Sequence, residues 1–253
     1  MSSVKYYLSN DNAFVIENYN DAPTFSSFFP GIAGIFGCPM WVFYTNRGQC
    51  ITSAGVQDKD GSILEFQPAN KACRSAAING FRTFIKVDGQ EYEPFTETCT
   101  CSKTMRIKPG SLTLVEENSK LKIRVTVTYF TLANEELPGL VRTVEVTNLA
   151  NKPRQLEIID GLPAVVPFGF VNDLLKRMSQ TIAAWSVVEN LKAPFYKLKV
   201  APADVAETHI IEQGNFYLSF CHQDNKESAV DIIVDPEIVF GEQQSCTCPT
   251  KFW

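Results

Sequence analysis

The side chains most often used for nucleophilic or acid–base catalysis are scarce in this sequence. Only two histidines are present, His209 and His222, so a catalytic triad would have to use one of these imidazoles. His222 directly follows Cys221, and neighbours on a strand point to opposite faces, so the two cannot form a dyad if this segment is a strand. The sequence also does not show which carboxylates lie close together, as a glycosidase pair must. We expect structural roles for both histidines and assign no catalytic residue.

Eight cysteines include two Cys-x-Cys pairs, Cys99/Cys101 and Cys246/Cys248. Each pair would place both thiols on one face of a strand, and the four sulfurs together could bind zinc. The spacing is unusual for such a site, because the cysteines of structural zinc sites are typically separated by roughly two to four residues. We expect all eight cysteines to be reduced thiols, and we assign no metal site.

Two glycine-containing segments resemble ligand loops only in part. Residues 31–37, Gly-Ile-Ala-Gly-Ile-Phe-Gly, lack the Gly-x-Gly-x-x-Gly spacing and the strand–helix context of a phosphate loop. We expect a loop whose glycines allow unusual backbone angles while Phe28, Phe29, Ile35 and Phe36 pack beneath it or against a neighbour. Residues 58–61, Asp-Lys-Asp-Gly, begin like a calcium loop, but the glycine comes too early, so we expect a plain turn.

The best candidate for a binding site is the segment in which an apolar strand pattern changes to polar side chains. Trp41 and Tyr44 offer aromatic faces on which a sugar could stack. Asn46, Arg47 and Gln49 surround a glycine and supply hydrogen-bond donors, and the planar guanidinium suits a carboxylate or sugar hydroxyls. These five residues are the predicted substrate-binding residues. An internal salt bridge is the alternative role for Arg47.

Period-two alternation of apolar and polar residues predicts antiparallel strands with one solvated face. The pattern is clearest in residues 121–129 and returns in 144–147 and 196–200. Asp88-Gly89 and Asn118-Ser119 stand between strand-like runs, which predicts two hairpins. Many short strands separated by turns favour a β-sandwich.

One segment has helical rather than alternating periodicity. Apolar residues recur every three or four positions from Val171 to Val188, and the stripe includes Trp185. We predict an amphipathic helix near 171–191 that packs on a sheet, with Asn172 as the N-cap and Pro194 preventing continuation. Trp185 is expected in the core.

Length and composition indicate an ordinary globular chain. With 253 residues, 45% of them hydrophobic, it can bury a core, and we expect one domain over residues 1–253. The net charge of −5 shows no run of either sign, so neither nucleic acid nor a membrane surface is an expected partner. The start has no apolar export segment, and no stretch approaches the roughly 18 apolar residues of a membrane span. These features predict a cytoplasmic protein.

Several segments, taken in order, closely resemble one enzyme family. They are FPGIAGIFGCPMWVFYTNRGQ (29–49), SAGVQDKDGSILEFQPANKA (53–72), GFRTFIK (80–86), YEPF (92–95), LPGLVRTVEVTNL (137–149) and LEIIDGLPAVVPFG (156–169). Together they resemble the amino-terminal region of inverting β-oligoglucan phosphorylases, which belong with or near cellobiose phosphorylase. No single motif is decisive, but the ordered set covers most of the chain.

The resemblance implies an antiparallel β-supersandwich, the galactose-mutarotase-like fold of aldose epimerases, followed in the full enzymes by a catalytic α-barrel domain. That barrel supplies the catalytic acid and binds inorganic phosphate, which attacks the anomeric carbon of a β-linked gluco-oligosaccharide. Phosphate is a substrate, and the resemblance implies no cofactor. The pattern of this chain predicts one helix rather than a barrel, so we expect the chain to be inactive by itself.

The resemblance also implies partners. The amino-terminal domain of such enzymes commonly forms the homodimer and lends loops that border the partner's sugar site, and residues 29–49 are the expected loop. Two alternatives remain open. A complete epimerase-like enzyme would need His209 or His222 to converge with a carboxylate in a concave pocket. A free-standing carbohydrate-binding protein would need an exposed aromatic platform.

Overall fold

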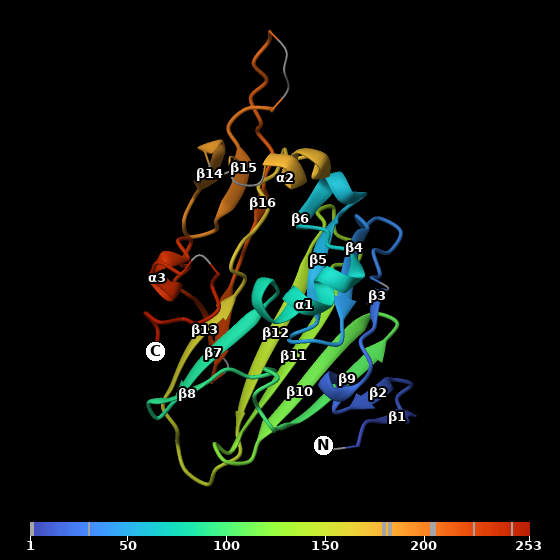
Figure 1. Ribbon diagram of the computed structural model, residues 1–253, viewed down its shortest axis with the longest axis vertical. Coiled ribbons are helices and arrows are strands. Elements are labelled where there is room, and N and C mark those ends of the chain that lie inside the picture. The colour runs from blue at the N-terminus through green and yellow to red at the C-terminus, as the bar shows by residue number, and fades with distance from the viewer. Residues whose placement is uncertain are drawn as a thin grey trace.

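The protein is a mainly-β structure built from several antiparallel sheets, as the sequence predicts (Figure 1). This computed structural model describes residues 3–29, 31–178, 181, 184–202, 206–224, 226–243 and 245–253. Within those ranges, no helix has both the length and the apolar character needed to cross a membrane.

The largest sheet has six antiparallel strands in the order β1-β2-β9-β10-β11-β12. Their bounds are Lys5–Leu8, Phe14–Glu17, Ser102–Lys108, Ser111–Asn118, Ile123–Thr131 and Leu140–Asn148. Along β11, buried and partly exposed residues alternate strictly, as the period-two pattern predicts. The strand begins two residues later than the pattern does, because Leu121 and Lys122 belong to the turn and Lys122 has a φ of +55°.

Two smaller sheets pack against the six-stranded sheet. One has the order β3-β4-β5-β6, with bounds Ser26–Phe28, Met40–Thr45, Ile51–Val56 and Ser62–Leu64. The other has the order β13-β7-β8, with bounds Leu156–Gly161, Arg82–Val87 and Gln90–Tyr92. Val42, Ile51 and Ile85 from these sheets join Leu114 and Val125 of the large sheet in one buried cluster. The core therefore lies between two layers, as in a β-sandwich.

Both predicted hairpin turns are confirmed. Asp88 and Gly89 connect β7 to β8, and both have positive φ, 51° and 81°, which suits the right-handed twist of the paired strands. The turn after Asn118 connects β10 to β11, where the Asn118 side chain accepts hydrogen bonds from the backbone N–H groups of Lys120 and Leu121 at 3.1 and 3.0 Å.

The predicted helix at 171–191 is wrong in its extent. Helix α2 covers only Asn172–Met178, and strand β14 (Ser186–Glu189) lies inside the predicted range; residues 179, 180, 182 and 183 lie outside the described part of the chain. Val187 and Val188 are β-branched, and β14 pairs with β15 (Phe195–Leu198), which outweighs the helical spacing. Trp185 is 39% exposed rather than in the core. Among the residues that the structure describes, none donates a hydrogen bond to the Asn172 amide oxygen, so it does not act as the predicted cap.

A second helix was not predicted. Helix α1 (Ala69–Asn79) contacts β4 and β5, and it buries Ala72 and Ala76. Its buried stripe consists of small residues, so it gives little of the apolar signal by which amphipathic helices are recognised. Short 3₁₀ helices are also present at Tyr19–Asp21 and Lys59–Gly61.

The remaining elements form smaller packing units at the other end of the chain. Strand β16 (Asn215–Phe216) joins β14 and β15, whereas β17 (Phe220–Gln223) and β18 (Lys226–Ala229) form an exposed hairpin. Figure 1 shows β14–β16 and α2 together at one end of the long axis. Helix α3 (Glu237–Phe240) returns to β7, where Phe240 packs edge-on against Phe84 with ring centroids 5.9 Å apart.

Candidate functional site

The loop between β4 and β5 carries three of the five predicted binding residues and is tightly fixed. Asn46 is fully buried, and its side-chain nitrogen donates to the carbonyls of Tyr19, Ala22 and Pro23 at 3.0, 3.3 and 3.1 Å. Its side-chain oxygen accepts from the backbone N–H of Phe25 at 2.9 Å. These contacts use the whole amide to hold the 19–25 segment in place.

A close approach of α1 explains the glycine in this loop. Gly48 has a φ of +53°, and a Cβ added there would lie 3.0 Å from the Cα of Ala77 in α1. The Gly48 carbonyl also accepts a hydrogen bond from the Tyr19 hydroxyl at 2.7 Å. Gly48 therefore lets the loop pass close to the last turns of α1.

The two predicted stacking residues pack inside the protein to different degrees. Tyr44 is only 5% exposed and meets Phe25 edge-on. Trp41 is partly exposed; its ring lies over Gly55, where a Cβ would approach to 2.5 Å, and its Nε1 donates to the carbonyl of Asp58 at 2.8 Å. Neither ring lines the pocket at Arg47.

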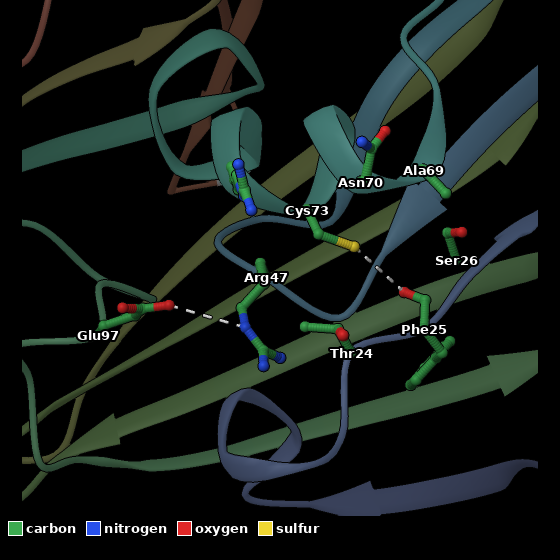
Figure 2. A pocket seen from close by; sticks show the side chains of 9 residues that line it. Thr24, Phe25, Ser26, Arg47, Ala69, Asn70, Cys73 and Glu97 are labelled. Atoms are coloured by element: carbon green, nitrogen blue, oxygen red, sulfur yellow. Dashed lines mark hydrogen bonds and ion pairs between the residues drawn. The ribbon is translucent and has the colours of Figure 1, made fainter.

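Arg47 borders a surface pocket of about 600 Å³ at the first turn of α1 (Figure 2). Its guanidinium donates to the carbonyls of Asn46 and Ala22 at 2.8 and 3.2 Å, and its Nε lies 3.7 Å from the Glu97 carboxylate. The salt bridge considered as the alternative is therefore present, but Glu97 is 72% exposed and the pair stands at the pocket rim. The lining residues are Thr24, Phe25, Ser26, Arg47, Ala69, Asn70, Cys73, Arg74 and Glu97.

The pocket offers hydrogen bonds rather than a pair of catalytic carboxylates. Ser26, Asn70 and Arg74 contribute hydroxyl, amide and guanidinium groups, and Glu97 is the one carboxylate among the lining residues. A set of donors and acceptors of this kind suits the hydroxyl groups of a sugar.

Gln49 belongs to a buried polar network whose other members are distant in the sequence. Its side-chain nitrogen donates to the Thr83 hydroxyl at 3.1 Å, and its oxygen accepts from Arg142. Arg142 also forms an ion pair with Asp160, and the Thr83 hydroxyl donates to the other Asp160 oxygen at 2.6 Å. The Tyr129 hydroxyl joins the network by donating to the Gln49 backbone carbonyl at 2.9 Å.

Burial changes the proton affinities around this network. It raises the pKa of Tyr129, although the nearby Arg142 opposes that change. Burial, together with the nearby Asp160 charge, raises the pKa of Tyr217 to about 12. The phenols therefore stay protonated at neutral pH, and the Arg142–Asp160 pair carries the charge of the network.

A second buried polar group surrounds Glu116. This fully buried carboxylate accepts from the Tyr92 hydroxyl and from the Phe95 backbone N–H, the latter at 2.6 Å. The Lys103 ammonium lies 3.9 Å away and donates to the carbonyls of Thr96 and Cys99 at 2.8 and 2.7 Å. Burial raises the pKa of Glu116 and lowers the pKa of Lys103.

The expectation that all eight cysteines are thiols is wrong for one pair. Cys99 and Cys101 are joined by a disulfide immediately before β9, and the Glu116 carboxylate lies within 4.8 Å of their sulfurs. Both cysteines are partly exposed. The structure joins these two sulfurs to each other, so it does not form the four-sulfur site that the two Cys-x-Cys pairs suggested.

Both histidines lie on the surface. His222 and Glu227 are cross-strand partners in the β17–β18 hairpin, with Nε2 3.2 Å from the carboxylate, and His209 lies 3.9 Å from Glu207. Their side chains are 70% and 64% exposed, and neither lines the pocket at Arg47. The convergence needed for an epimerase-like enzyme is not found there.

The glycine-rich segment 31–37 projects apolar side chains into solvent. Ile35 and Phe36 are 90% and 79% exposed. Their backbone is nevertheless held: the Asn134 side chain accepts from the Ile35 N–H at 3.1 Å, and the Asn134 N–H donates to the Ala33 carbonyl at 2.6 Å. Gly34, with a φ of +79°, passes so close to Asn134 that no Cβ would fit.

Comparison with known proteins adds no relative to this picture: the chain matches no protein-family model, and it matches no curated protein sequence.

Proposed function

We propose that this chain is a non-catalytic, carbohydrate-binding β-sandwich domain of a β-glucan oligosaccharide phosphorylase. The ordered resemblance across residues 29–169 supports the proposal, and the mainly-β fold agrees with the sandwich that this resemblance implies. In the parent enzyme a catalytic α-barrel domain of the same chain supplies the acid. Inorganic phosphate is the attacking substrate there, and the sugar is a β-linked gluco-oligosaccharide.

The exposed tip of the 31–37 loop is the observation that carries this proposal. An ordered loop that presents Ile35 and Phe36 to solvent is unusual for a surface that stays uncovered. Its backbone contacts with Asn134 hold the two side chains outward rather than letting them fold back. Such a tip suits insertion against a second copy of the chain, where it would border the partner's sugar site.

Loss of dimerisation on substitution of the tip would test this role. We expect the wild-type chain to form a dimer in sedimentation equilibrium and Phe36→Ser to shift it toward monomer, because the side chain would lose its apolar contact area. Leu191→Ser is the matched control, since Leu191 is 63% exposed but lies outside the tip. A monomeric wild-type chain, or equal dimerisation of all three proteins, would contradict the proposed interface.

The pocket at Arg47 is the proposed sugar contact. We expect cello-oligosaccharides to bind in isothermal titration calorimetry, and we expect Arg47→Ala to weaken binding by about two- to tenfold, the effect of losing one net hydrogen bond. Arg124→Ala, which removes an exposed guanidinium on β11, should bind normally. If Arg47→Ala instead unfolds several kcal/mol more easily, as for a broken buried ion pair, Arg47 is structural.

A free-standing carbohydrate-binding protein is the second candidate, and one observation favours it. Tyr6 and Phe14 are 52% and 43% exposed. Their rings stack with an interplanar angle of 19° and with centroids 6.3 Å apart. Stacked, half-exposed aromatics can receive a sugar ring. In that case Tyr6→Ala should weaken oligosaccharide binding, whereas Arg47→Ala should leave it unchanged.

A further inference from the structure

The disulfide between Cys99 and Cys101 lies in the segment that connects β8 to β9, beside the Arg47 pocket. Glu97, two residues before Cys99, is the carboxylate at the pocket rim (Figure 2). One short segment therefore carries both a pair of oxidisable sulfurs and a residue of the proposed sugar contact.

The position of this disulfide favours reversible rather than purely structural bonding. It joins residues two apart, so it closes a very short loop and removes little entropy from the unfolded chain. Both cysteines are partly exposed, and accessible disulfides are the ones that small thiols reduce. Disulfides that form in reducing compartments are usually transient or redox-sensing, and a reversible role of that kind is the one considered for this pair.

The contacts of the neighbouring Glu116 argue against a metal ion bound by these two sulfurs. Its two oxygens already accept hydrogen bonds from Tyr92 and the Phe95 N–H. The ammonium of Lys103, with only 6% of its side chain exposed, stands 3.9 Å from the carboxylate and would repel a cation. The carboxylate therefore already contacts two hydrogen-bond donors and an ammonium group. Two sulfurs alone make an incomplete site for zinc.

Lys103 connects the disulfide to the pocket. Its ammonium donates to the carbonyls of Thr96 and Cys99, which stand on either side of Glu97 in the sequence. The disulfide joins the Cys99 side chain to Cys101, next to the start of β9. While these contacts persist, the backbone at Glu97 is fixed and its carboxylate faces Arg47.

We propose that Cys99 and Cys101 form a thiol–disulfide exchange site for low-molecular-weight thiols, and that its oxidised state holds Glu97 at the Arg47 pocket. A small thiolate attacks one protein sulfur, the S–S bond breaks, and the other sulfur leaves and takes up a proton. A second small thiolate then attacks the sulfur of the bound small molecule, the mixed disulfide breaks, and the protein sulfur leaves and takes up a proton. The protein then gains two electrons and two protons, and two small thiols become one disulfide; a small-molecule disulfide drives the reverse reaction.

The exchange can be tested by peptide mapping. The chain is equilibrated with mixtures of reduced and oxidised glutathione, quenched in acid, and alkylated in denaturant. We expect the peptide containing Cys99 and Cys101 to pass from disulfide to two alkylated thiols as the reduced fraction rises. Cys248→Ser, in the other Cys-x-Cys pair, should leave this response unchanged, whereas Cys99→Ser should remove it.

Three results would overturn the exchange site. The peptide could stay disulfide-bonded in excess reduced glutathione, or stay reduced in excess oxidised glutathione. The reduced chain could also retain stoichiometric zinc that protects both thiols from alkylation, which would assign the pair to a metal.

Coupling to the pocket is tested separately by amide hydrogen exchange. We expect reduction to speed exchange of the amides in 96–98, with little change in β10. Unchanged exchange in a chain whose thiols respond would overturn the coupling. This readout needs no sugar, so it distinguishes a failure of the inference from a failure of the proposed function.

The effect on sugar binding rests on the proposed function. Reduction should weaken cello-oligosaccharide affinity by about two- to tenfold, because Glu97 would no longer be held as a hydrogen-bond acceptor. In Glu97→Ala, which removes the acceptor, this redox-dependent difference should shrink, while the peptide-mapping response stays intact. Equal affinity of the oxidised and reduced wild-type chains would overturn the role of Glu97 at the pocket.

Discussion

Polar side chains inside this sandwich find their partners on strands that are distant in the sequence. Arg142 on β12 meets Asp160 on β13 and Gln49 before β5, and the guanidinium, which is almost completely buried, is matched by both groups. Arg142 also stacks over Phe81, with its guanidinium carbon 5.0 Å from the ring centroid. Burial of a guanidinium is tolerated only when its charge and its donors are matched, so removal of one partner leaves the others uncompensated.

Loss of the Arg142 guanidinium should therefore destabilise the fold strongly. We expect Arg142→Ala to lower the free energy of unfolding by about 3 kcal/mol, the low end for a broken buried pair because Asp160 is 27% exposed. Urea denaturation measures the change. Arg124→Ala breaks the exposed Arg124–Glu117 pair and should cost less than about 1 kcal/mol. Equal losses in the two variants would contradict the role of burial.

Glu116 predicts an unusual dependence of stability on pH. Burial raises its folded-state pKa above the ordinary 4.5, so the folded chain binds this proton more tightly than the unfolded chain does. Its contribution to the free energy of unfolding is therefore full below pH 4.5, and it falls as the pH rises through the raised pKa.

Comparison of wild type with Glu116→Gln isolates this contribution. Urea denaturation over the acid to neutral range should show the wild type losing stability relative to the variant as the pH rises. Glu117→Gln controls for removal of a glutamate from the exposed face of the same strand. A difference that grows in favour of the wild type would mean that pairing with Lys103 outweighs burial.

At the scale of elements, the sequence predicts strands well where one face is wet. β11 and β12 match their alternation, and both hairpins form at the predicted turns. The helices are predicted poorly for opposite reasons. The Ala72 and Ala76 stripe of α1 is too small to produce an apolar signal, whereas the stripe from Val171 to Val188 has helical spacing but is divided between α2 and β14.

The turn at Gly89 gives a test of hairpin geometry. Gly89 has a φ of +81°, and a Cβ there would meet no atom within 4 Å, so Gly89→Ala changes only the backbone preference. We expect a loss of about 1 kcal/mol in the free energy of unfolding, from forcing alanine into the left-handed region. Glu91→Ala, an exposed change on the same hairpin, should stay within about 0.5 kcal/mol. Similar values for both would show that the turn tolerates a different conformation.

In the candidate site, the features that depend on local sequence could be predicted, and those that depend on contacts with distant segments could not. Arg47 reaches a pocket rim from a loop that the change of pattern after Tyr44 marks in the sequence. Burial of Asn46 and Gln49 could not be predicted, because their partners come from segments 19–25, 83 and 142. The disulfide could not be predicted from the residues, because the expectation of free thiols rested on an expected cytoplasmic location and not on the spacing of the cysteines.

At the scale of the whole molecule, the pocket at Arg47 is a surface feature of a mainly-β scaffold. The pocket at Arg47 has one carboxylate among its lining residues, and both imidazoles lie on exposed surfaces away from it. The charged side chains with the least exposure among the ion pairs, Glu116 and Arg142, contact internal partners. This arrangement suits binding and assembly, which is the part that the proposed function assigns to the chain.

The purified chain should therefore bind cello-oligosaccharides without cleaving them. Phosphorolysis requires a carboxylic acid that protonates the leaving oxygen while phosphate attacks the anomeric carbon, and in the proposed parent enzyme that acid belongs to the α-barrel domain. Incubation of the chain with cello-oligosaccharides and inorganic phosphate should release no glucose 1-phosphate, as measured by a coupled assay with added glucose 1-phosphate as the positive control. Release that persists in Arg47→Ala but is lost in His222→Ala would point instead to a catalytic site on the β17–β18 hairpin. Release lost in Glu97→Gln would place the acid at the pocket rim, and either result would overturn the assignment of this chain as a non-catalytic domain.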